Sequence, residues 1–216
     1  MKMSPTAVMS PSIKWPIRPL ASVVERIFVG LPMSRHIAKP GDESVTVSVL
    51  SVGDIEDGQI APSHLLPKVN LRAGNFDRFH VQTGDVLVSC RGTVLKAAPV
   101  FDRAQDLFTS SNIITIRIMR SLVAPQIILS LLRSAAWREV LESRTRSSTG
   151  LMQLTIKDLE DLPVPIPPHD VQANLVDLID TGERTYRVAL EAATARRALG
   201  EILINHTLLG YTHGNR

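Results

Sequence analysis

The stretch Leu162-Pro163-Val164-Pro165-Ile166-Pro167-Pro168 separates two parts of the sequence that have different patterns. Proline fixes φ and has no amide hydrogen to donate, so the four prolines in this stretch predict a stiff, extended connector. No proline occurs in residues 169–216. We therefore expect a body of mixed elements, then the connector, then a helical segment.

The residues after the connector have a helical repeat of apolar and small side chains. The spacing is near three and four, and the stripe contains Val171, Leu175, Leu178, Gly182, Tyr186, Ala189, Ala193, Leu199 and Leu203. This pattern predicts one helix over residues 169–208, about 55–60 Å long at 1.5 Å per residue. An isolated helix cannot bury its own stripe, which implies a partner helix. A helix folded back on its own body is the alternative, and Gly182 and Gly200 are positions where the helix could divide.

Short strand patterns lie upstream of the connector. Alternating or β-branched residues predict strands over 45–49, 86–89 and 114–118. Residues Leu20 to Phe28 are expected to form a short helix that stops before Gly30.

Helical spacing returns after Pro125, and Thr155 to Asp158 resembles a capping box. We therefore expect an α+β fold class: a globular mixed α/β body followed by one long helix. We divide the chain into a loose tail (1–19), the body (20–168), the long helix (169–208) and a second tail (209–216).

The composition is that of a folded protein: 44% of the residues are apolar and 21% are charged. No run approaches the ~18 apolar residues that a membrane span needs, and a secretory signal is not expected. The lone cysteine, Cys90, excludes an internal disulfide framework and fits a reducing compartment, so we expect a cytoplasmic location.

Positive charge is concentrated in the body. Residues 1–168 carry 19 Lys and Arg against 15 Asp and Glu, whereas residues 169–216 carry 5 against 6. Such an excess is compatible with a polyanion partner. An ordinary solvated basic surface would show the same balance.

Local motifs for catalysis are missing from the sequence. It has no phosphate-binding Gly-x4-Gly-Lys-Ser/Thr loop, no Gly-x-Ser-x-Gly elbow and no Glu-x-Lys or Asp-x-Lys triplet of a magnesium nuclease. The histidines are scattered without zinc-ligand spacing. We therefore expect a binding module without a metal or cofactor of its own. An enzyme with a dispersed site remains an alternative.

Several segments, taken in order, carry a resemblance to a known family. They are Gly30-Leu31-Pro32, Val52 to Ile60, Gly84 to Lys96, Ser110 to Asn112, Ser148 to Leu154, and Leu162 to Pro168 with Gln172. In this order and spacing they resemble the DNA specificity (S) subunits of type I restriction-modification systems, over about residues 20–205. The chain departs from the family where a Thr commonly precedes Pro32 and where a Gly commonly precedes Lys96.

The resemblance implies a phage-defence role. A target recognition domain would bind one half of a split double-stranded DNA site, and the long helix would pair with another helix and dock methyltransferase subunits. The usual subunit carries two recognition domains and two helices, so this chain resembles a half-size form that acts as a homodimer or with a second half. It would have no activity alone; the partner adenine DNA methyltransferase would bind S-adenosylmethionine.

Side chains that donate hydrogen bonds from loops and strand ends are the candidates for DNA contacts. These are Arg35, His36, Arg91, Thr93, Lys96, Arg144, Arg146, Ser147, Ser148 and Thr149. Arg144 and Arg146 could instead compensate a helix C-terminus. The segment that contains Lys68, Arg72 and Arg78 is expected to be irregular, and these three residues are expected to lie on the ordinary protein surface without contacting DNA. A scaffold protein that assembles through its long helix, without binding DNA, is the alternative function.

Overall fold

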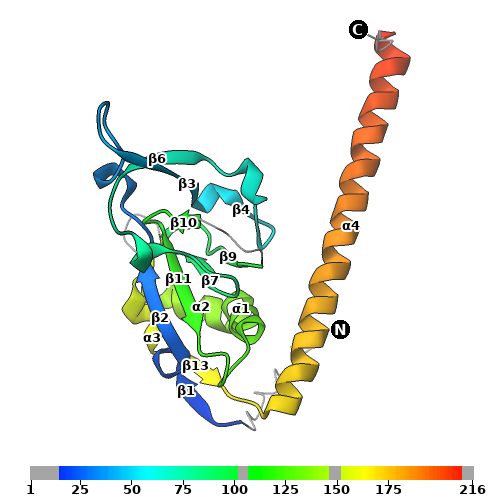
Figure 1. Cartoon of the computed structure of the whole chain (residues 1–216). Coiled ribbons are helices and arrows are strands. Elements are labelled where there is room, and N and C mark those ends of the chain that lie inside the picture. The colour runs from blue at the N-terminus through cyan, green and yellow to red at the C-terminus, as the bar shows by residue number, and fades with distance from the viewer. Residues whose placement is uncertain (1–14, 102–106, 146–151, 211–216) are drawn as a thin grey trace, which may run out of the picture. The chain divides into compact units, whose positions relative to one another are not determined.

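The computed structural model describes residues 15–101, 107–145 and 152–210 (Figure 1). The chain divides into two compact units, Met1–Gln172 and Ala173–Arg216. Unit 1 contains the strands of the described residues and the helices α1, α2 and α3, whereas the described part of unit 2 consists of most of helix α4.

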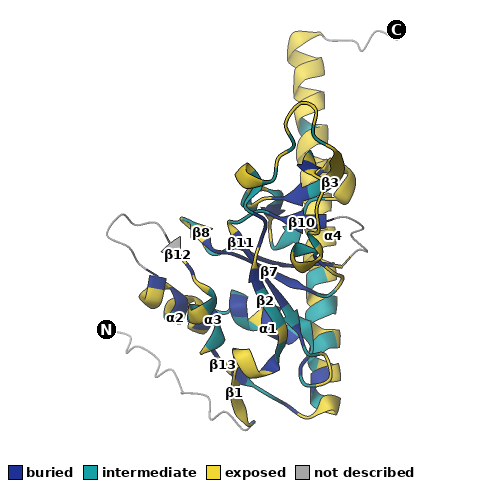
Figure 2. Ribbon diagram, turned by 60° about the vertical axis from the view of Figure 1, so that its left-hand side comes forward, coloured by how far each residue is buried: buried dark blue, intermediate teal, exposed yellow. Residues whose placement is uncertain are grey.

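A four-stranded antiparallel sheet forms the centre of unit 1. Its order is β2 (Val24–Val29), β11 (Ile113–Ile118), β7 (Val86–Ser89) and β9 (Ala97–Pro99). Residues 113–116 are all buried, so both faces of β11 are covered. Buried residues concentrate along these strands (Figure 2). The strands predicted over 86–89 and 114–118 are present.

A second sheet adjoins the first, with the order β10 (Leu107–Thr109), β3 (Ser44–Leu50) and β6 (Lys68–Arg72). The strand predicted over 45–49 lies within β3. The remaining strands pair two by two: β1 (Ile17–Pro19) with β13 (Pro163–Pro165), β4 (Ile55–Glu56) with β5 (Gln59–Ile60), and β8 (Arg91–Gly92) with β12 (Met152–Gln153). Short 3-10 helices cover Leu20–Val23, Met33–Arg35, Val52–Asp54, Ser63–Leu65 and Asp77–Phe79.

The helical segment after Pro125 is divided in two. Helix α1 (Pro125–Arg133) packs on β9 and β7, and α2 (Ala135–Thr145) follows after Ser134. The Ser134 hydroxyl accepts a hydrogen bond from the Trp137 amide at 3.3 Å and therefore begins a new helix. Helix α3 (Ile156–Glu160) has the predicted capping box, since Thr155 and Asp158 bond each other's amides.

Three local predictions are wrong. Residues Leu20 to Phe28 form a 3-10 turn and strand β2 rather than a helix, because β-branched side chains pair with β11 and Phe28 is buried. Ile17–Pro19, expected within the tail, form β1. Lys68–Arg72, expected to be irregular, alternate polar and apolar residues and form β6.

The proline segment is extended, as predicted, but it belongs to the body. Pro163–Pro165 pair antiparallel with β1, and Leu162 and Val164 are fully buried. The Leu20 amide donates to the Leu162 carbonyl at 2.9 Å. The prolines therefore place an edge strand in unit 1 rather than a free connector.

Helix α4 (His169–Leu209) is the predicted long helix and continues through both Gly182 and Gly200. Gln172 is the last residue of unit 1, and among the described residues of α4 it is the buried one. In the predicted stripe Leu178, Tyr186, Leu199 and Leu203 are more than half exposed, while Val171 lies in unit 1 and is half-buried. Among the described residues, no helix is long and apolar enough to cross a membrane.

Candidate nucleic-acid interface

Four segments from distant parts of the sequence meet at one edge of the central sheet. Because β11 is antiparallel to both neighbours, its first residues lie beside the last residues of β2 and β7: Ile114 pairs with Val29, and Ile113 with Ser89. Strand β8 brings β12 to the same edge by pairing Arg91 with Gln153. We call this surface the loop edge, and it comprises residues 30–32, 90–93, 110–112 and 152–153.

Backbone hydrogen bonds hold the loop edge together. The amides of Gly30 and Leu31 donate to the carbonyls of Ile113 and Thr109 at 2.9 and 2.7 Å. The Cys90 amide donates to the Asn112 carbonyl at 2.8 Å. A Cβ atom at residue 30 would lie 2.3 Å from the carbonyl oxygens of Thr109 and Ser110. Residue 30 must therefore be glycine for these two backbone segments to approach each other this closely.

Arg91 and Thr93 are exposed at the loop edge, where donors can reach a ligand. The preceding Cys90 is buried, and burial raises the pKa of its thiol above the ordinary value despite the opposing charge of Arg91. Its Sγ lies 3.5 Å from the Ser111 carbonyl. Cys90 therefore supports the edge from inside while Arg91 faces solvent.

Lys96, predicted to contact DNA, makes hydrogen bonds inside unit 1. Its Nζ donates to the carbonyls of Ile55 and Val52 at 2.7 and 3.3 Å. The chain turns back after β7, since Ser89 and Lys96 exchange backbone and side-chain hydrogen bonds. Lys96 thus secures the turn before β4, and its contact with DNA stays a prediction.

Arg35 and His36 lie next to β6 rather than at the loop edge. Arg35 is exposed, while the half-buried His36 ring meets Phe76 edge to face, with centroids 5.2 Å apart. The Arg72 amide donates to the His36 carbonyl at 2.8 Å. This segment therefore connects the loop edge with the second sheet.

Arg144 is exposed at the end of α2, and its Nη1 donates to the Asp158 carbonyl at 2.9 Å. This bond fits the structural alternative for Arg144 better than a free DNA-contacting role. Arg146, Ser147, Ser148 and Thr149 lie outside the described residues.

Two polar residues of the loop edge were missed by the sequence analysis. Asn112 and Gln153 are exposed beside the candidates already named. Asn112 closes a polar Ser-Ser-Asn run between two strands, which was an available signal. Gln153 had no comparable signal, because its position depends on pairing with Arg91 across some sixty residues.

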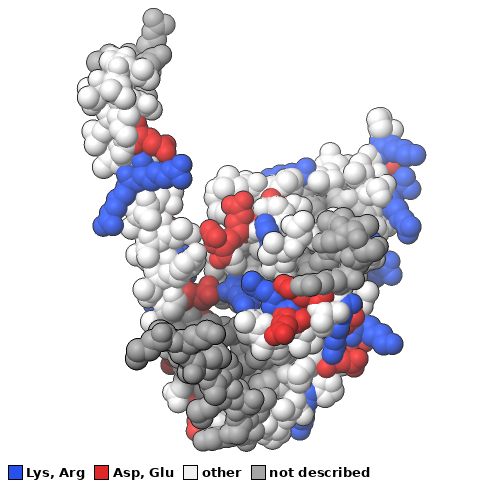
Figure 3. Space-filling view, turned by 180° about the vertical axis from the view of Figure 1, so that it is seen from behind, with Lys and Arg blue, Asp and Glu red and all other residues white. Residues whose placement is uncertain are grey.

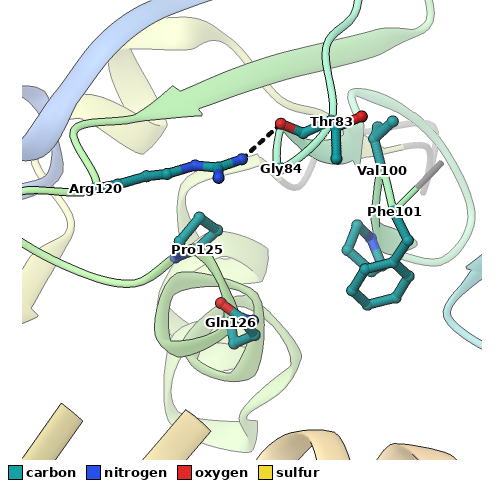
Figure 4. Close-up of a pocket in the computed structure, with 8 residues that line it drawn as sticks. Thr83, Gly84, Val100, Phe101, Arg120, Pro125 and Gln126 are labelled. Carbon is teal, nitrogen blue, oxygen red and sulfur yellow. Dashed lines mark hydrogen bonds between the residues drawn. The ribbon is translucent and has the colours of Figure 1, made fainter. Parts of the chain in front are cut away.

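A pocket of about 200 Å³ lies at the opposite end of β7, around Arg120 (Figure 4). Arg120 donates to the Thr83 carbonyl at 2.6 Å, and Val100, Phe101 and Gln126 complete much of the wall. Its lining contains no carboxylate, thiol or imidazole, so it offers no acid–base or nucleophilic pair. The described residues also contain no group of three or more potential metal ligands.

Comparison with protein families gives a match over most of the chain. The family model of the type I restriction modification DNA specificity domain matches residues 46–194. The comparison with curated proteins gave no match.

Three solved structures have a similar fold. The HsdS subunit from Thermoanaerobacter tengcongensis has 17% identity and a TM-score of 0.58 over 95% of this chain and 51% of its own. A structure describing complex assembly and conformational transition of the type I R-M system has 16% identity, a TM-score of 0.60, and coverage of 94% and 50%. The type I restriction-modification S subunit from M. genitalium has 15% identity, a TM-score of 0.53, and coverage of 94% and 51%. This chain thus spans about half the length of each.

Proposed function

This chain belongs to the type I restriction modification DNA specificity family, and we propose that it binds one half of a bipartite double-stranded DNA site. The observation that carries the proposal is the family match over residues 46–194, which spans β8 and β12 of the loop edge. The loop edge offers exposed hydrogen-bond donors for DNA, on a surface that backbone hydrogen bonds hold in place. In this proposal the chain is not an enzyme. It directs a partner adenine DNA methyltransferase, which binds S-adenosylmethionine.

Arg91 is the proposed base-reading residue of the loop edge. A guanidinium can donate two parallel hydrogen bonds to O6 and N7 of guanine in the major groove. Thr93 and Asn112, exposed on the same edge, would contact phosphates or neighbouring bases. Residues 146–149 remain proposed phosphate contacts.

A selection from randomised duplexes tests the DNA-binding proposal. The chain, copurified with its methyltransferase subunit, should enrich a defined sequence, and binding should weaken steeply as salt rises because phosphate contacts release counterions. Arg91→Ala should relax one position of the enriched sequence. Arg18→Ala, which removes an exposed cation from β1, is the matched control and should leave the sequence unchanged. Selection of no sequence, with salt-insensitive binding of a protein partner, would support the scaffold alternative.

We further propose that two copies pair through antiparallel α4 helices. The helix presents large exposed apolar residues, among them Leu178, Leu199 and Leu203. Two copies would together supply two recognition bodies, and identical halves related by two-fold symmetry would bind an interrupted palindrome. The partner methyltransferase would then reach adenines in both half-sites.

Two neighbouring residues provide a sharp test of the pairing. Leu203 and Ile202 are 58% and 56% exposed, but at about 100° per residue Ile202 lies roughly 140° from the centre of the stripe, whereas Leu203 lies within it. Leu203→Glu should convert a dimer to a monomer in light scattering, whereas Ile202→Glu should not. Equal effects of the two changes, or a monomeric unmodified chain both alone and with the methyltransferase, would contradict the pairing.

A further inference from the structure

Strands β3 and β6 form an antiparallel pair within the second sheet, which we call the β3–β6 ribbon. Strand β10 pairs with β3 at residues 48–50, and residues 36–38 bond the other edge of β6. The outer face of the ribbon is polar throughout. In the antiparallel register Ser44 lies opposite Arg72, Thr46 opposite Asn70, and Ser48 opposite Lys68. These six residues share one face because side chains alternate along a strand. All are exposed except Ser48, which is half-buried. The face therefore carries hydroxyls, an amide and two cations, and no carboxylate.

The opposite face of the ribbon fixes its orientation. Val47, Val49 and Leu71 are buried in one cluster with Leu31 and Phe108. A slip of one residue in either strand would bury charges and expose these apolar groups. The polar face is consequently presented to solvent in one defined arrangement.

Two hydrogen bonds orient the donors of this face. The Thr46 hydroxyl donates to Oδ1 of Asn70 at 2.8 Å, which directs the amide nitrogen of Asn70 away from Thr46. At the end of the ribbon Nε of Arg72 donates to Oδ2 of Asp42 at 3.1 Å. Asp42 also accepts the Lys39 amide at 2.9 Å. This second bond, more than the arginine, holds the pKa of Asp42 below its ordinary value, so the carboxylate stays ionised beside Arg72.

Cations outnumber acids around the ribbon. Residues 35–48 and 68–72 contain four cations, Arg35, Lys39, Lys68 and Arg72, against two acids, Asp42, which pairs with Arg72, and Glu43. Lys and Arg side chains project along the margin of unit 1 that carries β3 and β6 (Figure 3). This balance fits a phosphate-bearing ligand.

Resting on the proposed function, we propose that the polar face of the β3–β6 ribbon lies against the major groove of the half-site and that Asn70 and Arg72 read bases there. The five paired positions of this face span about 14 Å, which is enough for its side chains to contact neighbouring base pairs. Asn70 has the paired acceptor and donor that match N6 and N7 of adenine, while the outer nitrogens of Arg72 match O6 and N7 of guanine. Lys68, at the other end of the face, contacts a phosphate.

Within this proposal Thr46 and Asp42 are positioning residues. Thr46 leaves the second lone pair of the Asn70 oxygen and both amide hydrogens to the base. Asp42 holds the plane of the Arg72 guanidinium through Nε. The backbone of His36 borders the ribbon beside Arg72, while its ring packs on Phe76 at the apolar side.

The test is the selection experiment described above, repeated with ribbon variants of the copurified complex. Asn70→Ala and Arg72→Ala should each relax one position of every half-site and weaken binding of the selected duplex by about 5- to 150-fold. Lys68→Ala should weaken binding of all duplexes and lower the salt slope by about one, without changing the sequence. Thr46→Val should reproduce part of the Asn70→Ala effect at the same position.

The controls separate this inference from the proposed function. Arg18→Ala, at the end of unit 1 that carries β1, removes one exposed cation and should change nothing (Figure 1). Unchanged thermal unfolding of each variant shows that an effect on binding is not loss of the fold. If the unmodified complex selects a sequence and Arg91→Ala alters it, but Asn70→Ala and Arg72→Ala do not, the ribbon is not a reading element. If the unmodified complex selects no sequence, the proposed function itself fails.

Discussion

Arg117 and Asp85 form a two-pronged ion pair inside unit 1, with Nε–Oδ1 and Nη2–Oδ2 distances of 2.9 Å. Asp85 also accepts the Gln82 amide at 2.8 Å, and Arg117 donates to the His80 carbonyl at 3.1 Å. The hydrogen bonding of Arg117 to the Asp85 carboxylate, more than any other contact, raises the pKa of Arg117 above its ordinary value. The aspartate of the Gly84-Asp85 turn is thus a structural residue that joins β7 to β11.

Asp85→Asn should lower the free energy of unfolding by about 3–5 kcal/mol, because it leaves the arginine charge without its partner in a largely dry site. Urea denaturation measures the change. Glu201→Gln is the control, since it breaks an exposed pair with Arg197 and should cost less than about 0.5 kcal/mol. Similar losses for the two variants would contradict a stabilising role of the buried pair.

Gln172→Ala should detach the first turn of α4 from the body. The Gln172 side chain accepts the Ala124 amide and donates to the carbonyls of Leu122 and Pro167, each at 2.9 Å. Removing it leaves buried backbone groups unsatisfied, which should cost about 2–3 kcal/mol.

Hydrogen exchange gives a direct readout of that change, because the Ala124 amide should exchange faster in Gln172→Ala. Gln172→Glu keeps an acceptor for this amide but has no donor for the two carbonyls, and it should be destabilised too. Asn174→Ala, exposed on the same helix, should behave as the unmodified chain. Unaltered exchange at Ala124 in Gln172→Ala would refute the role given to this side chain.

Gly30→Ala should destabilise unit 1 by about 3 kcal/mol or more, because the added methyl group would overlap backbone oxygens that cannot move aside independently. The comparison is Gly53→Ala, where the nearest atom is Ser51 Oγ at 3.6 Å and ordinary contact results. Its unfolding midpoint should stay close to that of the unmodified chain. A stable Gly30→Ala protein with unchanged spectra would mean that the loop edge is looser than described.

The Cys90 thiol should resist Ellman's reagent at mildly alkaline pH in the folded protein and react promptly after denaturation. It is 4% exposed, and its raised pKa lowers the fraction of thiolate at any given pH. The folded state holds this proton more tightly than the unfolded state. The thiol therefore stabilises the fold below the ordinary thiol pKa, and this contribution is lost as pH rises through the folded pKa.

Comparison with Cys90→Ala isolates that contribution from other titrations. The stability difference between the two proteins should shift in favour of the variant as pH rises above the ordinary thiol value. Rapid modification of the native protein would instead indicate an accessible, reactive cysteine.

Local patterns were sufficient for elements whose identity depends on nearby residues. The apolar run 86–89, the capping box at Thr155 and the helical repeat after Pro168 each specify a period or a turn within a few residues. The local pattern of Leu20 to Phe28 gave a wrong prediction, because pairing with β11 overrides a weak helical spacing. The order of family motifs was also visible in the sequence, and it indicated the family before any contact was known.

Tertiary structure alone decided which of the candidate side chains bond within the protein and which stay exposed to solvent. Lys96 turns inward to two carbonyls, Arg144 bonds α3, and Arg91 stays exposed, although all three are cations near turns. The amino-acid sequence by itself determined the α+β body, the long helix and the segments that matter. Strand pairing across tens of residues determined the register, and therefore which of those segments share a surface, because no local pattern encodes the partner of a strand.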